Sequence, residues 1–102
     1  MPEIMKLLNL STGHLPQHVR DDMDAIATPG ADFSSTDWRS RVLVTAWFGY
    51  GWLLYVFDEW EAQDVPLPIA LRDCLAFARR QDAGFIKFDV DVEPIADLAL
   101  YE

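Results

Sequence analysis

The sequence predicts one α+β domain over residues 1–102, with its elements in the order β-α-β-β-α-β. The chain has 102 residues, 51% of them hydrophobic and 25% charged, which is typical of a single folded domain. Two stretches repeat apolar residues at helical spacing, and four short runs are apolar or alternating. Hairpin pairing and right-handed crossovers then favour a ferredoxin-like split β-α-β-β-α-β fold, with a four-stranded antiparallel sheet and two helices on one face.

The first predicted elements are a strand over residues 4–10 and a helix over residues 15–26. The strand run is short and almost wholly apolar, as expected of a central strand covered on both faces. Pro16 suits the first turn of the helix, where its missing N–H costs nothing. The apolar stripe of this helix consists of Leu15, Val19, Met23 and Ile26.

The middle of the chain predicts a hairpin after a loop over residues 28–39. Strands are expected over residues 41–48 and 52–57, because both are rich in β-branched and aromatic residues. The turn between them, residues 49–51, contains two glycines. An acidic connection over residues 58–64 follows.

The last part of the chain predicts a helix, a strand and a tail. Pro66 and Pro68 open the helix, and Gly84 is expected just after its end. Residues 85–92 alternate as a strand with one buried face, and residues 94–102 are expected to form a single helical turn or an extended tail. The inner stripe of the helix consists of Leu67, Leu71, Cys74, Leu75 and Ala78.

The charge balance limits the function classes. Eight Lys and Arg against 17 Asp and Glu give a net charge of −9. Direct binding of nucleic acid or of an anionic membrane is therefore not expected, because both need basic residues. The single cysteine, Cys74, fits a reducing cytosol, and no apolar run approaches the roughly 20 residues of a membrane span. These features predict a cytoplasmic protein.

Two acidic segments are the candidate binding residues. The densest charge run follows the hairpin and contains Trp60, and a second set follows the last strand. If the strand ends converge, these carboxylates form an anionic patch that would dock onto a basic protein surface and speed association. An exposed aromatic ring would anchor such a contact. The predicted partner-binding residues are Asp58, Glu59, Trp60, Glu61, Asp64, Asp89, Asp91 and Glu93.

Catalytic and metal sites find less support in the residues. On a continuous strand, Asp89, Asp91 and Glu93 would share one face at a spacing of about 6–7 Å, and three carboxylates can hold Mg²⁺ or Ca²⁺. His14 and His18 are four residues apart but have no obvious third ligand. Cys74 falls on an apolar stripe, where a thiol behaves as a small hydrophobe. No catalytic residue, metal or cofactor is predicted.

Three short motifs resemble a known group of proteins. They are Leu10-Ser11-Thr12-Gly13-His14-Leu15, Tyr50-Gly51-Trp52 and Phe88-Asp89-Val90-Asp91. The first resembles the L-S-T-x-H-[LI] opening of a family of short uncharacterised bacterial, phage and plasmid proteins. This resemblance implies a mobile-element or accessory-gene setting and no particular activity. By size, charge and context the chain also resembles small anti-CRISPR and anti-restriction inhibitors.

The sequence as a whole predicts a non-enzymatic acidic binding protein. The expected role is a mobile-element inhibitor that occupies the basic, nucleic-acid-binding surface of a host defence protein. One alternative is a metal-dependent enzyme or module that uses Asp89, Asp91 and Glu93, together with His14. The other alternative is a structural accessory subunit that forms a homodimer through the open sheet face or an edge strand.

Overall fold

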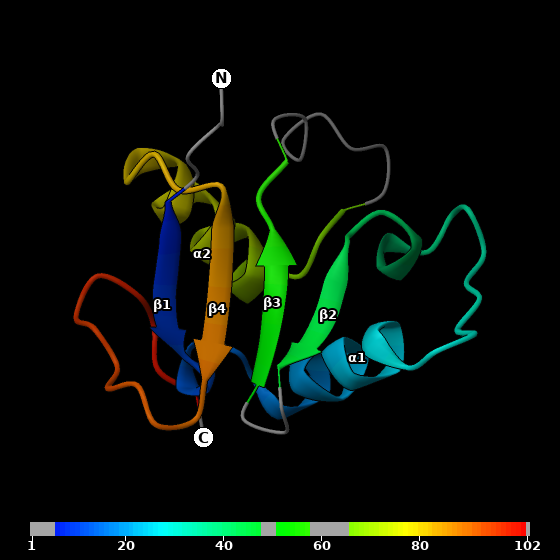
Figure 1. Ribbon diagram of the computed structural model, residues 1–102, viewed down its shortest axis with the longest axis horizontal. Helices are drawn as coiled ribbons and strands as arrows, with labels where there is room; N and C mark the ends of the chain where they lie inside the picture. The colour runs from blue at the N-terminus through cyan, green and yellow to red at the C-terminus, as the bar shows by residue number, and fades with distance from the viewer. Residues whose placement is uncertain (1–5, 48–50, 58–65, 102) are drawn as a thin grey trace.

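The computed structural model describes residues 6–47, 51–57 and 66–101 and confirms the predicted order of strands and helices (Figure 1). The two α-helices are α1 (Gln17–Ala27) and α2 (Ile69–Arg80), and two short 3-10 turns are η1 (Thr12–His14) and η2 (Trp38–Ser40). None of the helices in these ranges is long and apolar enough to cross a membrane. The four strands are β1 (Leu7–Ser11), β2 (Val44–Trp47), β3 (Gly51–Tyr55) and β4 (Phe85–Asp89).

The sheet is mixed, and the prediction of a wholly antiparallel sheet is wrong. The strand order is β1-β4-β3-β2, with β1 parallel to β4 and the other two pairs antiparallel. The ferredoxin-like arrangement is therefore not confirmed. The apolar run of β1 suggested a central strand, but β1 lies at an edge and Leu7 is 46% exposed. The central strands are β4 and β3, and the inner residues Ile86 and Phe88 of β4 are fully buried.

Both α-helices cover the same face of the sheet, as predicted (Figure 1). Strand alternation turns one set of side chains toward the helices and the other set away from them. The registers place Leu10, Phe88, Trp52 and Ala46 in one row of the helix-covered face. No helix formed by the described residues lies over the opposite face of the sheet (Figure 1). The core between sheet and helices includes Leu10, Leu15, Val19, Met23, Leu54, Leu71, Leu75, Ile86 and Phe88.

Helix α2 ends at Arg80, four residues before Gly84, which the sequence had placed just after the helix. The residue in the left-handed conformation is Asp82, at φ 59°, and not Gly84. The amide of Ala83 donates to the carbonyl oxygen of Ala78 at 2.9 Å, which closes the helix around Asp82. An aspartate tolerates this conformation better than most residues, so glycine was not required. The predicted inner residues Leu71, Cys74, Leu75 and Ala78 are buried on α2, whereas Leu67 is buried but lies before the helix begins.

Candidate functional site

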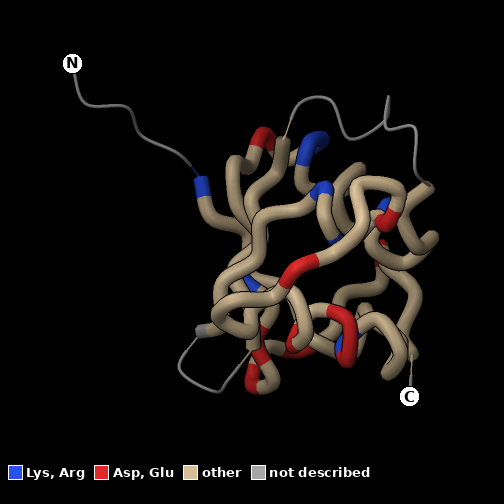
Figure 2. The backbone as a smooth tube through the Cα atoms, turned by 90° about the vertical axis from the view of Figure 1, so that its right-hand side faces the viewer, with Lys and Arg blue, Asp and Glu red and all other residues tan. Residues whose placement is uncertain are grey.

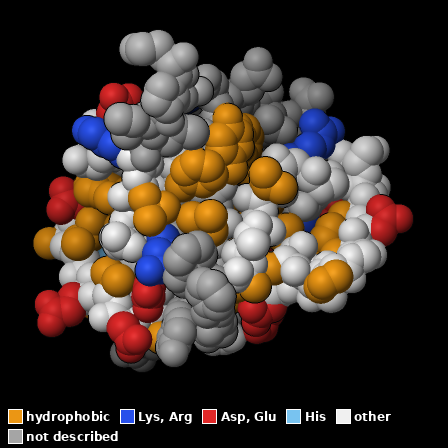
Figure 3. Space-filling view, in the orientation of Figure 1, with side chains coloured by type: hydrophobic (Ala, Val, Ile, Leu, Met, Phe, Trp, Pro, Cys, Tyr) orange, Lys and Arg blue, Asp and Glu red, His pale blue; other side chains and the backbone are white. Residues whose placement is uncertain are grey.

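The uncovered face of the sheet carries a line of apolar side chains that crosses β1, β4 and β3 and ends beside the start of β2 (Figure 3). Phe85 is the register partner of Leu7 on one side and of Tyr55 on the other. The amide of Tyr55 donates to the carbonyl oxygen of Leu43 at 3.1 Å, which adds the edge strand beside β3. We call this set the apolar row, and it consists of Leu7, Phe85, Tyr55 and Leu43.

The apolar row is accessible to solvent and contains an aromatic contact. Leu43 is 67% exposed and Tyr55 is 37% exposed. The rings of Tyr55 and Phe85 meet edge to face, with centroids 5.7 Å apart, a favourable aromatic geometry. Exposed apolar side chains are ordinary when they are scattered, but a contiguous set is typical of an interaction surface.

A polar pair follows the apolar row on β4. Lys87 and Asp89 lie on the same uncovered face because they alternate with the buried Ile86 and Phe88. The Nζ atom of Lys87 lies 3.4 Å from Oδ2 of Asp89, and both side chains are only partly exposed. The uncovered face therefore combines an apolar line with an adjacent ion pair.

The three C-terminal carboxylates do not share a strand face, so the prediction of a strand over residues 85–92 is wrong beyond Asp89. Strand β4 ends at Asp89, where the backbone turns. The Oδ1 atom of Asp89 accepts a hydrogen bond from the amide of Asp91 at 2.9 Å, and this contact holds the turn. Asp91 and Glu93 then lie in exposed loop. Among the described residues, no group of three or more His, Cys, Asp or Glu is placed to hold a metal ion.

The predicted acidic residues after the hairpin lie outside the described residues. These are Asp58, Glu59, Glu61 and Asp64, together with Trp60. In the described part of the chain, Figure 2 shows acidic residues at several separate places with basic residues between them.

One of these acidic residues is held in a local ion pair. Arg39 Nη2 lies 2.7 Å from Oδ2 of Asp37, and Arg39 Nη1 lies 3.4 Å from Oδ1 of Asp22. The hydrogen bond from the Arg39 side chain, followed by that from its backbone amide, lowers the pKa of the Asp37 carboxyl. The Asp37 carboxylate therefore caps the start of η2.

The aromatic residues of the hairpin divide between the core and the uncovered face. Trp52 is buried, and its Nε1 donates to Oδ1 of Asp24 at 2.9 Å. Phe57 packs partly against the core. Tyr55 is the exposed ring among those whose side chains are described. Tyr55 therefore presents an exposed ring on the uncovered face, whereas Trp60, the ring that the sequence proposed as an anchor, lies outside the described residues.

His14 is a structural residue rather than a metal ligand. Its ring is 1% exposed, and both nitrogens contact the backbone of the C-terminal segment. Nδ1 donates to the carbonyl oxygen of Ala99 at 2.8 Å, and Nε2 accepts from the amide of Ile95 at 3.1 Å. The ring therefore carries its proton on Nδ1 and leaves no lone pair for a metal. His18 is exposed on α1.

The residues around His14 hold the same C-terminal segment. The Ser11 hydroxyl accepts from the amide of Gly13 at 3.0 Å, which caps η1. The carbonyl oxygen of Gly13 accepts from the amide of Tyr101 at 2.7 Å. Arg20 donates through Nε to the carbonyl oxygen of Leu15 at 2.7 Å. The L-S-T-G-H-L motif thus fastens the end of the chain against the first helix.

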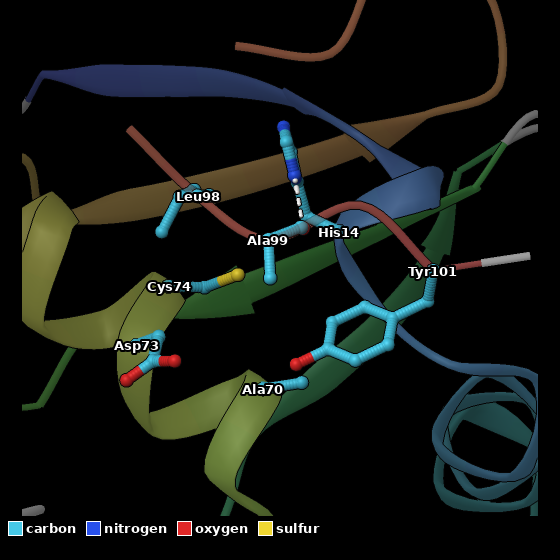
Figure 4. A pocket seen from close by; sticks show the side chains of 7 residues that line it. All are labelled: His14, Ala70, Asp73, Cys74, Leu98, Ala99 and Tyr101. Carbon is cyan, nitrogen blue, oxygen red and sulfur yellow. Dashed lines mark hydrogen bonds between the residues drawn. The ribbon is translucent and has the colours of Figure 1, made fainter. Parts of the chain in front are cut away.

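A cysteine lies beside His14 without forming a nucleophilic site (Figure 4). Burial, and secondarily the charge of Asp73, raises the pKa of the Cys74 thiol to about 12. The thiol is therefore protonated at neutral pH, and His14 has no free nitrogen with which to remove the proton. The space enclosed by His14, Cys74, Ala99 and Tyr101 has no room for a water molecule. This seam is packing between α2 and the C-terminal segment.

These features define a small α+β domain with helices on one sheet face and an accessible apolar row on the other. A family model described as the C-terminal domain of a family of unknown function (DUF5983) matches residues 7–102, and the chain belongs to that family. The match includes both the L-S-T-G-H-L motif and the segment that it holds. Comparison with curated proteins and with solved structures gave no match.

Proposed function

We propose that this domain is a non-enzymatic binding protein that docks onto a basic surface of a partner protein through the uncovered face of its sheet. The observation that carries the proposal is the apolar row, in which large side chains from β1, β4 and β3 and from Leu43, just before β2, lie side by side on a face that no described helix covers. Burying such a row against a partner would contribute about 25 cal/mol for each Å² of apolar area removed from water.

Tyr55 is the central anchor of this surface. It lies between Phe85 and Leu43 in the apolar row, and its ring is oriented by the edge contact with Phe85. Tyrosine is enriched among the residues that dominate binding energies, because it buries a large ring while its hydroxyl keeps a polar partner. The adjacent Lys87–Asp89 pair would form part of the polar rim.

Charge selects the class of partner. The chain carries a net charge of −9, and its densest acidic run begins at Asp58, three residues after Tyr55 in the sequence. A basic partner would be attracted by this field, which raises the association rate most strongly at low salt. The proposed electrostatic residues are the predicted Asp58, Glu59, Glu61 and Asp64, with Asp89, Asp91 and Glu93.

We propose further that the partner surface is one that binds nucleic acid in the cytoplasm, and that the protein acts as a mobile-element inhibitor of the anti-CRISPR or anti-restriction type. The support is the acidic charge, the small size and the resemblance of the L-S-T-G-H-L motif. The test is competition on the captured partner. Duplex or single-stranded nucleic acid is expected to displace the protein, and equal retention at every nucleic-acid concentration would exclude this kind of partner.

The role of the uncovered sheet face is tested by capturing the partner from extracts of the native host. Three immobilised forms of the protein are used: the wild type and two variants. The Leu43→Ser, Tyr55→Ser double variant removes two exposed side chains of the apolar row. Ile69→Ser is the matched control, because Ile69 is 75% exposed on α2, away from the sheet. The wild type and Ile69→Ser are expected to retain the same partner, and the double variant is expected to lose it. An unchanged partner on the double variant would contradict the proposal.

The charge contribution is tested separately by kinetics. Neutralising Asp58, Glu59 and Glu61 together to Asn and Gln is expected to slow association with the captured partner at low salt. The dissociation rate is expected to change less, because rim charges act mainly during approach. An association rate equal to that of the wild type in 20 mM salt would contradict the proposed role of these charges. It would not bear on the proposed binding through the uncovered sheet face.

A further inference from the structure

The outer edge of β2 presents backbone groups that point away from the sheet. Because the amide of Tyr55 donates to the carbonyl oxygen of Leu43, these two residues form a hydrogen-bonded pair of the antiparallel ladder. The pairing alternates along the strand, so Thr45 also faces β3. The N–H and C=O groups of Val44 and Ala46 therefore point outward, and no other described residue bonds to them.

This edge lacks the features that normally protect an edge strand. Residues 42–47 contain no charged residue, proline or glycine, although natural edge strands usually carry such residues to block pairing with other chains. The other edge of the sheet differs, because the C-terminal segment passes alongside β1 (Figure 1). The β2 edge is thus the part of the sheet that is suited to accept another strand.

A hollow beside β2 provides room for an added segment. It has a volume of about 300 Å³ and is lined by Val42 and Val44 together with Asp32 and Phe33 of the preceding loop. Arg39 also lines this hollow, but its guanidinium is paired with Asp37 and Asp22. The exposed carboxylate of Asp32 therefore favours a basic side chain of the added segment there.

We infer that an extended segment of the partner protein adds to β2 as a fifth strand and places a Lys or Arg next to Asp32. The inference rests on the proposed function and specifies how the partner is held. Backbone hydrogen bonds to Val44 and Ala46 give the contact its register, and apolar side chains of the added strand continue the apolar row beyond Leu43. A basic partner segment is favoured over a second copy of this chain, because two copies with a charge of −9 each repel one another.

The experiment uses a proline substitution that removes an outward N–H. Ala46→Pro deletes the N–H that an added strand would use and leaves the bonds between β2 and β3, because proline is tolerated at this position of an edge strand. Ala46→Ser is the matched control. Immobilised wild-type protein is used to select binders from a displayed library of random 12-residue peptides, and the affinity of each selected peptide is then measured on all forms.

Selected peptides are expected to contain Lys or Arg and to bind wild type and Ala46→Ser equally. Their affinity for Ala46→Pro is expected to fall at least about tenfold, and methylation of alternate peptide nitrogens is expected to cause a similar loss. If Ala46→Pro does not fold, the methylated peptides alone test whether the added segment binds through its backbone. Peptides that lose affinity for the Leu43→Ser, Tyr55→Ser variant but bind Ala46→Pro normally would overturn strand addition. Such peptides would still support binding through the apolar row.

Two further outcomes would count against the inference. Failure to select any peptide on the wild type would overturn it, and partner capture would still test the proposed function. Concentration-dependent dimers that Ala46→Pro abolishes, measured by sedimentation from 5 to 500 µM, would assign the edge to a second copy.

Discussion

The Nε2 atom of His14 accepts a hydrogen bond from the backbone amide of Ile95, 81 residues later in the chain. The same ring donates through Nδ1 to the carbonyl oxygen of Ala99. One buried side chain therefore satisfies two backbone groups of a segment that has no regular secondary structure. The C-terminal segment depends on this ring for its position as much as on the packing of Leu98 and Tyr101.

Replacing His14 by Phe is expected to destabilise the fold. Phenylalanine fills a similar volume but leaves the amide of Ile95 and the carbonyl of Ala99 without partners, which costs about 2–4 kcal/mol in unfolding free energy. Urea unfolding followed by circular dichroism measures the change. His18→Phe is the control, because His18 is exposed on the same part of the chain. Equal stability of the two variants would refute the structural role of His14.

Replacing Gly51 by Ala is expected to disrupt the pairing of β3 with β4. A Cβ at this position would lie 1.7 Å from the carbonyl oxygen of Phe88, and backbone cannot move aside as a flexible side chain can. A loss of more than about 3 kcal/mol is expected. Gly30→Ala is the comparison, since a Cβ at Gly30 meets nothing within 4 Å and only its φ of 81° is unfavourable. The midpoint temperature of thermal unfolding should be much higher for the Gly30→Ala variant than for the Gly51→Ala variant.

Cys74 is expected to resist alkylation in the native protein. Burial raises the pKa of its thiol to about 12, so almost no thiolate is present at pH 8. Iodoacetamide should modify the protein in urea within minutes and the native protein far more slowly, as followed by mass spectrometry. Rapid modification of the native form at pH 8 would show that the thiol is accessible and ionised.

The same thiol is expected to make the fold sensitive to alkali. Its pKa is raised above the ordinary value of 9.0, so the folded state keeps a proton that the unfolded state has lost. This stabilising contribution is complete below pH 9 and is lost as the pH rises toward 12. The difference in unfolding free energy between wild type and Cys74→Ala should therefore shrink over that range. A difference that stays constant would contradict the assignment.

Asp37 is expected to titrate below the ordinary range of an aspartate. The Arg39 side chain and the Arg39 amide both donate to its carboxylate and lower its pKa. Carbon-13 NMR should show the Asp37 midpoint rising in Arg39→Gln, although only in part, because the backbone hydrogen bond remains. The contribution to stability is present above the unfolded-state pKa and is lost as the pH falls. Identical midpoints in the two proteins would argue against the pair.

The helices were predictable because their patterns are local. The stripe from Leu67 to Ala78 repeats at helical spacing, and the structure buries it as that spacing requires. The order of strands in the sheet was not predictable in the same way. The alternation of residues 85–89 indicates a strand with one buried face, but it carries no information about whether the neighbour of β4 is β1 or β3.

The role of the L-S-T-G-H-L motif could not be derived from spacing, because its partners lie more than 80 residues away. The sequence offers no third ligand beside His14 and His18, but nothing local predicts that the backbone of Ala99 and Ile95 binds the His14 ring. The apolar row could not be predicted from the sequence for the same reason. Leu7, Leu43, Tyr55 and Phe85 come from four separate segments, and only the strand registers bring them into line.

The strand that joins β1 to the hairpin is the last of the described strands along the chain. Leu7 pairs with Phe85, and β1 meets β3 and β2 in the sheet only through β4. Before β4 is in place, β1 is not joined to the hairpin in the sheet, although α1 already contacts the hairpin through the bond from Trp52 to Asp24. Because β1 and β4 are far apart in the sequence, closing this long loop is expected to be slow compared with the formation of the helices.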